Sequence, residues 1–140
     1  MKVVLDTDVL VAASRGRLGA SRAWLQAVLT GEAVALLSVP LVLQYEAELT
    51  QPEHLAHSGV TIADIGRLLD ALCAVGRPVG ISYLWRPVLR DPDDEMVLEA
   101  AINGGADRLL TFNERDFRGA NRFGAIVERP GPAWRAWRQG

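Results

Sequence analysis

The chain alternates short, continuously apolar runs with longer segments in which apolar residues recur every three or four positions. A short apolar run is typical of a strand that is buried on both faces, whereas the wider spacing is typical of an amphipathic helix. Strands are therefore predicted at residues 3–5, 33–37, 79–82, 108–111 and 125–127. Their alternation with helices predicts an α/β sandwich around a mostly parallel central sheet.

Helices are predicted between these strands, at residues 9–13, 21–29, 40–48, 62–75 and 91–102, and capping residues help to place them. Ser21 is a candidate N-cap and Gly31 a stop signal. Thr61 and Asp64 have the spacing of a capping box, with aspartate in place of the usual glutamate. Residues 51–59 are polar and interrupted by a proline, so no helix is predicted there.

Composition limits the class of protein without naming a function. With 140 residues, of which 49% are hydrophobic, the chain is expected to form a single folded domain over residues 1–140. No apolar stretch is long enough to span a bilayer, and the N-terminus lacks a signal-peptide pattern, so a cytoplasmic protein is expected. A lone cysteine, Cys73, excludes an internal disulfide framework and a cysteine-based zinc site.

Acidic residues recur where the predicted strands end and the predicted helices begin. They are Asp6 and Asp8 after the first strand, Glu46 after the second, Asp91, Asp93 and Asp94 at the start of a helix, and Asp116 after the fourth strand. Several of these acids could have a purely structural role instead of a functional one, since Asp91 could be an N-cap and Glu46 a solvated helix residue. Asp6 fits such a role least, because its apolar neighbours indicate burial.

Carboxylates gathered at one edge of a sheet repel one another, and a divalent cation removes that repulsion. A set of ligands made only of oxygen atoms selects Mg²⁺ or Mn²⁺ over zinc. Such an ion can orient a phosphodiester and activate water. The pattern therefore predicts a metal-dependent nuclease that needs neither histidine nor cysteine. The net charge of −2 does not by itself indicate a nucleic-acid binder. Acids that bind a metal, however, offset an equal number of basic surface charges in this sum.

These acids, in this order, resemble those of the PIN-domain family, and in particular its VapC-like toxins. The segments that carry the resemblance are 5–10 (LDTDVL), Glu46, 91–94 (DPDD) and 110–117 (LTFNERDF). The resemblance implies an α/β fold in the form of a three-layer α/β/α sandwich. It also implies a metal-dependent endoribonuclease that cleaves RNA, with an antitoxin protein as partner and a homodimeric state. It assigns catalysis to Asp6, Glu46, Asp94 and Asp116, and binding of Mg²⁺ or Mn²⁺ to Asp6, Asp94 and Asp116. It implies supporting roles for Thr7, Asp8, Asp91, Thr111 and Asn113, the last standing where many relatives have an acid.

The remaining polar and aromatic residues have less distinctive patterns. Candidate contacts to the RNA backbone are Arg15, Arg17, Arg115 and Arg118, all in predicted loops near the acidic motifs. We expect His54 and His57 to be exposed, Cys73 to be a core residue, Trp24 and Trp85 to lie in the core or an interface, and Glu95, Glu99 and Glu114 to be surface charges. Trp134 and Trp137 fit a terminal helix packed on the domain, or else stacking on nucleobases.

Two other functions are compatible with parts of this pattern. Asn113, in place of an acid, favours a catalytically inactive PIN-type module that binds RNA or protein. A receiver-like domain would also place acids after its first strand, but it needs a lysine late in the chain. Lys2 is the only lysine, so the receiver-like interpretation fails.

Overall fold

The structure, a computed structural model, describes residues 1–16, 19–81, 89 and 91–140. Within these residues a sheet of parallel strands has the order β3–β2–β1–β4–β5. The strands are β1 (Lys2–Leu5), β2 (Val34–Leu37), β3 (Arg77–Pro78), β4 (Arg108–Leu110) and β5 (Val127–Glu128). The prediction for the third strand was misplaced, because residues 77–78 rather than 79–82 pair with β2; residue 82 lies outside the described residues. As an edge strand, β3 tolerates the missing N–H of Pro78.

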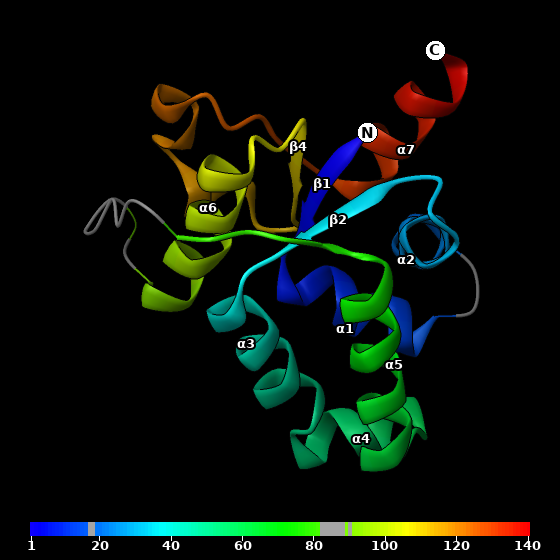
Figure 1. Ribbon diagram of the computed structural model, residues 1–140. Coiled ribbons are helices and arrows are strands. Elements are labelled where there is room, and N and C mark those ends of the chain that lie inside the picture. Colours follow the sequence, from blue (N-terminus) through cyan, green and yellow to red (C-terminus); the bar gives the residue numbers. More distant parts are fainter. Residues whose placement is uncertain (17–18, 82–88, 90) are drawn as a thin grey trace.

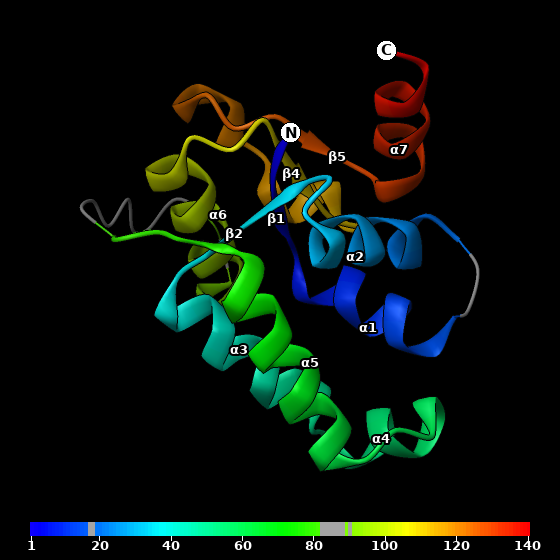
Figure 2. The same ribbon diagram turned by 45° about the vertical axis from the view of Figure 1, so that its right-hand side comes forward.

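Helices cover both faces of this sheet, which confirms the predicted α/β/α sandwich. They are α1 (Thr7–Arg15), α2 (Ala20–Thr30), α3 (Val39–Leu49), α4 (Pro52–Ser58), α5 (Ile62–Val75), α6 (Pro92–Gly104) and α7 (Pro130–Gln139), with the short 3₁₀ helices η1 (Glu114–Phe117) and η2 (Ala120–Phe123). Helix α6 contacts β1, β2 and β4 on one side of the sheet. Helices α1, α2 and α7 lie on the other side (Figures 1 and 2).

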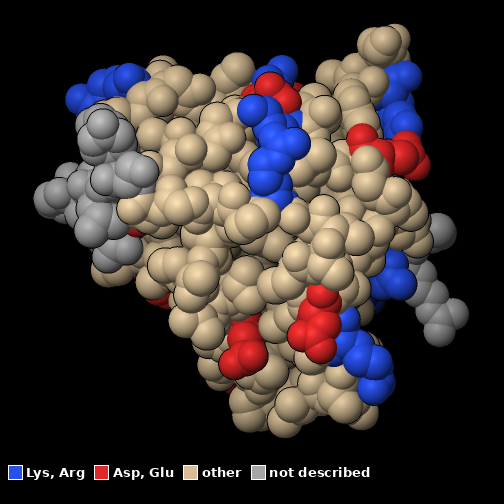
Figure 3. Space-filling model, in the orientation of Figure 1, with Lys and Arg blue, Asp and Glu red and all other residues tan. Residues whose placement is uncertain are grey.

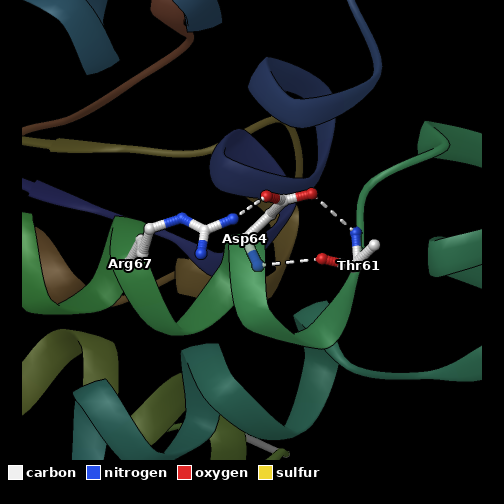
Figure 4. Close-up of polar contacts among 3 residues, drawn as sticks. All are labelled: Thr61, Asp64 and Arg67. Carbon is white, nitrogen blue, oxygen red and sulfur yellow. Dashed lines mark hydrogen bonds and ion pairs between the residues drawn. The ribbon is translucent and has the colours of Figure 1, made fainter.

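Capping interactions fix where several helices begin. At the start of α5, the Asp64 backbone N–H donates to Thr61 Oγ1 (3.1 Å), while the Thr61 backbone N–H donates to Asp64 Oδ2 (2.9 Å). Arg67 forms an ion pair with the same carboxylate (Figure 4). The hydrogen bonds from Thr61, followed by the contact with Arg67, lower the pKa of Asp64. The predicted capping box is therefore confirmed with aspartate in the second position.

Two local predictions were wrong. Residues 52–58 form α4, because Pro52 occupies the first turn, where its missing N–H is harmless, and Gly59 ends the helix with a φ of 73°. The cap of α2 is Gly19, and Ser21 lies buried inside the first turn instead. Gly31 ends α2 in the left-handed conformation, as predicted.

The register of the central strands brings two distant loops together. Leu5 at the end of β1 is paired with Leu110 at the end of β4, and the backbone N–H of Asp6 donates to the Leu110 carbonyl (2.9 Å). The buried Tyr45 hydroxyl on α3 donates to the Leu5 carbonyl (2.5 Å). Parallel strands thus place the residues that follow β1 and β4 side by side, with α3 fixed against them.

The C-terminal helix packs on the domain through its tryptophans. Trp24 of α2 is fully buried and stacks on Trp137 with a centroid distance of 5.0 Å, while Trp134 meets it edge-on at 5.2 Å. The Trp24 Nε1–H donates to the Pro130 carbonyl (3.0 Å), and the Arg138 guanidinium lies over the rings of both α7 tryptophans. The packing interpretation of these tryptophans is confirmed. Trp85 lies outside the described residues.

The face shown in Figure 3 carries few charged side chains over much of its area. Large apolar residues are exposed on the helices α3 and α5, namely Val39, Leu43, Ile62 and Val75. In the part of the chain that is described, no helix combines the length and apolar character needed to cross a membrane.

Candidate active site

Asp6, the first residue after β1, is almost completely buried, with 7% of its surface exposed. Its Oδ1 accepts a hydrogen bond from the Thr7 backbone N–H (2.7 Å), and its Oδ2 accepts one from Thr111 Oγ1 (2.7 Å). Burial, followed by the negative charges of Asp8 and Asp116, raises the pKa of Asp6 to about 6, although the two hydrogen bonds oppose this change. The carboxylate is thus oriented by fixed donors, but no cation among the described residues lowers its pKa.

Asp8, two residues further along, binds the loop that follows β4. Its Oδ2 accepts hydrogen bonds from the Phe112 backbone N–H (3.1 Å) and from the Asn113 side-chain amide (3.0 Å). Thr111 Oγ1 also lies 3.4 Å from this oxygen. Burial raises the pKa of Asp8, and its Oδ1 is buried without a hydrogen-bond partner among the described residues. Asp8 therefore holds the two strand ends together and leaves one carboxylate oxygen available.

The start of α6 contributes further carboxylates. Asp91 is the N-cap of this helix, and its Oδ1 accepts a hydrogen bond from the Asp93 backbone N–H (2.9 Å). Asp94 is half-buried, and burial raises its pKa to about 7, with the charges of Asp6, Asp91, Asp116 and Asp93 adding to the effect. The charge of Asp6 therefore acts on Asp94, and the charge of Asp116 on η1 acts on both carboxylates.

These residues line an open hollow of about 210 Å³, which we call the acidic cleft. Of the residues predicted from the sequence, it is lined by Asp6, Thr7, Asp8, Asp91, Asp94, Asn113 and Asp116. Thr111 is buried just beneath it through its hydrogen bond to Asp6. Asp93, one of the acids noted in the sequence but given no role there, also lines the cleft. The sequence did not predict two further lining residues, Gln44 and Glu48.

Glu46 was expected in this site, but the structure places Glu48 there instead. Glu46 is exposed on α3 and does not line the acidic cleft. Gln44 and Glu48 both line it, and the Gln44 amide donates to Glu48 Oε1 (3.2 Å). Residues four apart share a helix face, whereas a residue between them points away. The buried positions Leu41, Tyr45 and Leu49 define the inward face of α3, and Glu48 flanks that face.

The chemistry of the residues that line the acidic cleft suits a hard divalent cation, although these side chains do not converge on one point in this structure. Among the described residues, no group of three or more histidine, cysteine or acidic side chains is close enough to hold a metal ion. The carboxylates that could bind a metal nevertheless supply only oxygen atoms, and one Asp8 oxygen has no hydrogen-bond partner among the described residues. Burial, reinforced by like charges, raises the pKa of Asp6 and Asp94. A cation would relieve that repulsion, and oxygen donors select Mg²⁺ or Mn²⁺.

Positively charged residues border this region. Arg115 on η1 and Arg118 directly after it are exposed near Asp116, whereas Arg17 lies outside the described residues. Arg129, which the sequence did not single out, donates to the Phe112 carbonyl (3.2 Å), and its charge lowers the pKa of Asp8. Arg129 thus places a positive charge near Asp8, as binding of a phosphodiester backbone would need.

Four predictions about isolated residues were wrong. His54 is buried, with 3% of its surface exposed, whereas Cys73 is exposed and lines an apolar groove. Glu95 and Glu99 are each only 2% exposed, because α6 is covered by the sheet and by neighbouring segments; Glu95 Oε1 accepts a hydrogen bond from the Leu89 backbone N–H (2.7 Å). His57 and Glu114 are exposed, as predicted.

Comparisons with known proteins agree with this geometry. A family model described as PIN domain matches residues 2–115. No curated protein matches the chain. Among solved structures, the chain is similar to a chain from the crystal structure of VapBC2 from Rickettsia felis bound to a DNA fragment from their promoter. The TM-score is 0.59 at 14% identity, and the alignment covers 92% of this chain and 98% of that chain, which establishes a shared fold.

Proposed function

The chain belongs to the PIN-domain family, and from this premise we propose that it is a Mg²⁺- or Mn²⁺-dependent endoribonuclease. The observation that carries the proposal is the convergence of Asp6, Asp94 and Asp116 on one cleft, where burial, reinforced by the like charges of neighbouring carboxylates, raises the pKa of Asp6 and of Asp94. Acids with a purely structural role are not expected at positions where burial and like charges raise their pKa.

In the proposed mechanism, Asp6, Asp94 and Asp116 would hold the cation, with Glu48 beside them. A divalent ion bound there would supply Lewis acidity for the activation of water and for stabilising the leaving oxygen of the RNA phosphodiester. Thr111 and the Thr7 backbone N–H keep the Asp6 carboxylate in a fixed orientation. Asp8 keeps the loop after β4 in place, so that Asp116 stays at the edge of the cleft.

We further propose that the protein is the toxin of a toxin–antitoxin pair and that it forms a homodimer. The similar structure from Rickettsia felis belongs to a VapBC2 complex, which supports an antitoxin partner for this chain. A segment of that partner would block the acidic cleft. The exposed apolar side chains on α3, Val39 (74% exposed) and Leu43 (60%), support a dimer contact at this helix.

A catalytically inactive module that binds RNA or protein is the second candidate. It is favoured by Asn113, whose amide is engaged with Asp8 Oδ2 where a further acid would otherwise contribute charge. Retention of the three carboxylates at the cleft favours the nuclease.

The test that separates the two candidates is cleavage of single-stranded RNA by the purified protein in EDTA and in Mn²⁺. We expect cleavage only with the metal, and a loss of at least about 100-fold in Asp94→Asn. Asp70→Asn, on the exposed side of α5, serves as the matched control and should cleave normally. Cleavage that persists in both EDTA and the Asp94 variant would contradict the proposed function, and binding of RNA without cleavage would favour the inactive module.

A further inference from the structure

A second cleft adjoins the acidic cleft, between the end of α1 and the start of α4. We call it the Arg15–His54 cleft, and its volume is about 520 Å³, within the range of small-molecule sites. Glu48 lines both clefts, so a ligand chain that crosses one can continue into the other. The polar groups that line the new cleft are Arg15, Glu48, Gln51, Glu53 and His54.

Buried His54 fixes the position of Arg15. The Arg15 Nε–H donates to His54 Nδ1 (3.3 Å), so His54 is neutral and carries its proton on Nε2. Burial, together with the charges of Arg15 and His57, lowers the pKa of His54 and keeps it in this state. His54 Nε2 is buried without a hydrogen-bond partner among the residues described.

Arg15 itself is exposed and retains unused donors. Its Nε is occupied by His54, and no carboxylate of the described residues forms an ion pair with it. Because the guanidinium is planar, anchoring Nε orients the terminal nitrogens as a fork of donors. The cleft therefore combines a donor group from α1 with acceptors from α3 and α4.

The mixture of charges in the cleft favours a nucleobase over a phosphate. Glu48 and Glu53 would repel a phosphate, whereas they can accept hydrogen bonds from the N–H groups of a base. Val11 supplies apolar surface for the face of the ring. Guanine fits best, because its O6 and N7 accept from an arginine fork while its N1–H and N2–H₂ donate to a carboxylate.

We propose that the Arg15–His54 cleft binds a base of the RNA strand whose phosphate lies in the acidic cleft, and that it prefers guanine. Arg15 and Glu53 read the edges of this base, and His54 acts as a positioning residue for Arg15. This inference rests on the proposed RNA substrate and adds to it a preference for sequence next to the cleaved bond.

The test is binding of fluorescent single-stranded RNA in EDTA, which stops metal-dependent cleavage. Four oligouridines are compared that differ at one central position, occupied by G, A, C or U. We expect the G oligonucleotide to bind about 10-fold more tightly than the others. Arg15→Ala should abolish this preference, Glu53→Gln should reduce it, and Arg135→Ala on the distant α7 should leave it unchanged.

Arg15→Lys distinguishes reading of the base from simple charge attraction, since lysine keeps the charge but loses the fork. We expect it to bind all four oligonucleotides with nearly equal affinity. Equal weakening of all four by Arg15→Ala, with no preference in the native protein, would mean a phosphate contact and would overturn the inference. The inference would also be overturned if the Arg15–His54 cleft does not bind RNA and instead binds a side chain of a protein partner.

Cleavage mapping in Mn²⁺ separates this inference from the function on which it rests. Cleavage without any base preference, unchanged in Arg15→Ala, would overturn the role of the Arg15–His54 cleft and leave the nuclease intact. Selective binding of the G oligonucleotide without cleavage of any RNA would overturn the nuclease and leave the base-binding cleft.

Discussion

Replacing Asp6 with asparagine should stabilise the metal-free protein at neutral pH, although it removes a proposed metal ligand. The side chain is 7% exposed and close to two other carboxylates, and its pKa is raised from 3.8 to about 6. Each pH unit of difference corresponds to about 1.4 kcal/mol, so the ionised carboxylate costs the folded state about 3 kcal/mol. Asparagine has a similar shape and carries no charge, and its oxygen can still accept from the Thr7 N–H.

The sign of the pH dependence follows from the same values. Between pH 3.8 and about 6 the folded protein holds a proton on Asp6 that the unfolded chain has released. The free energy of unfolding therefore decreases as the pH rises through this window, and the loss persists at higher pH. We expect Asp6→Asn to be more stable than the native protein by about 1–3 kcal/mol at pH 7.5 in EDTA. The free energies of unfolding of the variant and of the native protein should converge near pH 3.5.

Urea denaturation followed by circular dichroism, at pH values from 3.5 to 7.5 in EDTA, measures this difference. Addition of Mn²⁺ should stabilise the native protein, by about 2.7 kcal/mol at one hundred times the dissociation constant, and the variant much less. Asp70→Asn, an exposed position on α5, should stay within about 0.5 kcal/mol at every pH. A variant that is less stable than the native protein at pH 7.5 in EDTA, or a difference that does not change with pH, would refute the reasoning.

Two further variants test other parts of the structure. Glu48→Gln should weaken Mn²⁺ binding, measured by calorimetry, by about 10-fold, whereas Glu46→Gln should leave it unchanged, because only Glu48 lines the acidic cleft. The same affinity for both variants would argue against the role of Glu48. Trp137→Ala should lower the free energy of unfolding by about 2–4 kcal/mol, since its ring stacks on Trp24. If that variant instead loses RNA affinity at unchanged thermal stability, the ring stacks on nucleobases.

Much of the fold could be predicted from local patterns. The apolar run before Asp6 correctly predicted both the first strand and the burial of the acid, and Thr61 with Asp64 correctly predicted a capped helix. Such signals act within one strand or one turn of helix, so the neighbouring sequence contains all that is needed. The parallel sheet followed from the alternation of elements.

The composition of the two clefts depended on tertiary structure. Both Glu46 and Glu48 are polar residues on a predicted helix, and only the packing of Tyr45 and its neighbours against β1 decides which acid faces the acidic cleft. His54 has a polar local sequence, yet contact between α1 and α4 buries it against Arg15. The sequence by itself determined most of the elements, though not α4 or the position of β3, and it determined the supply of acids, because those depend on short-range propensity and periodicity. The rotation of each helix and the burial of its polar residues depend on segments distant in the chain, so only the folded structure decided them.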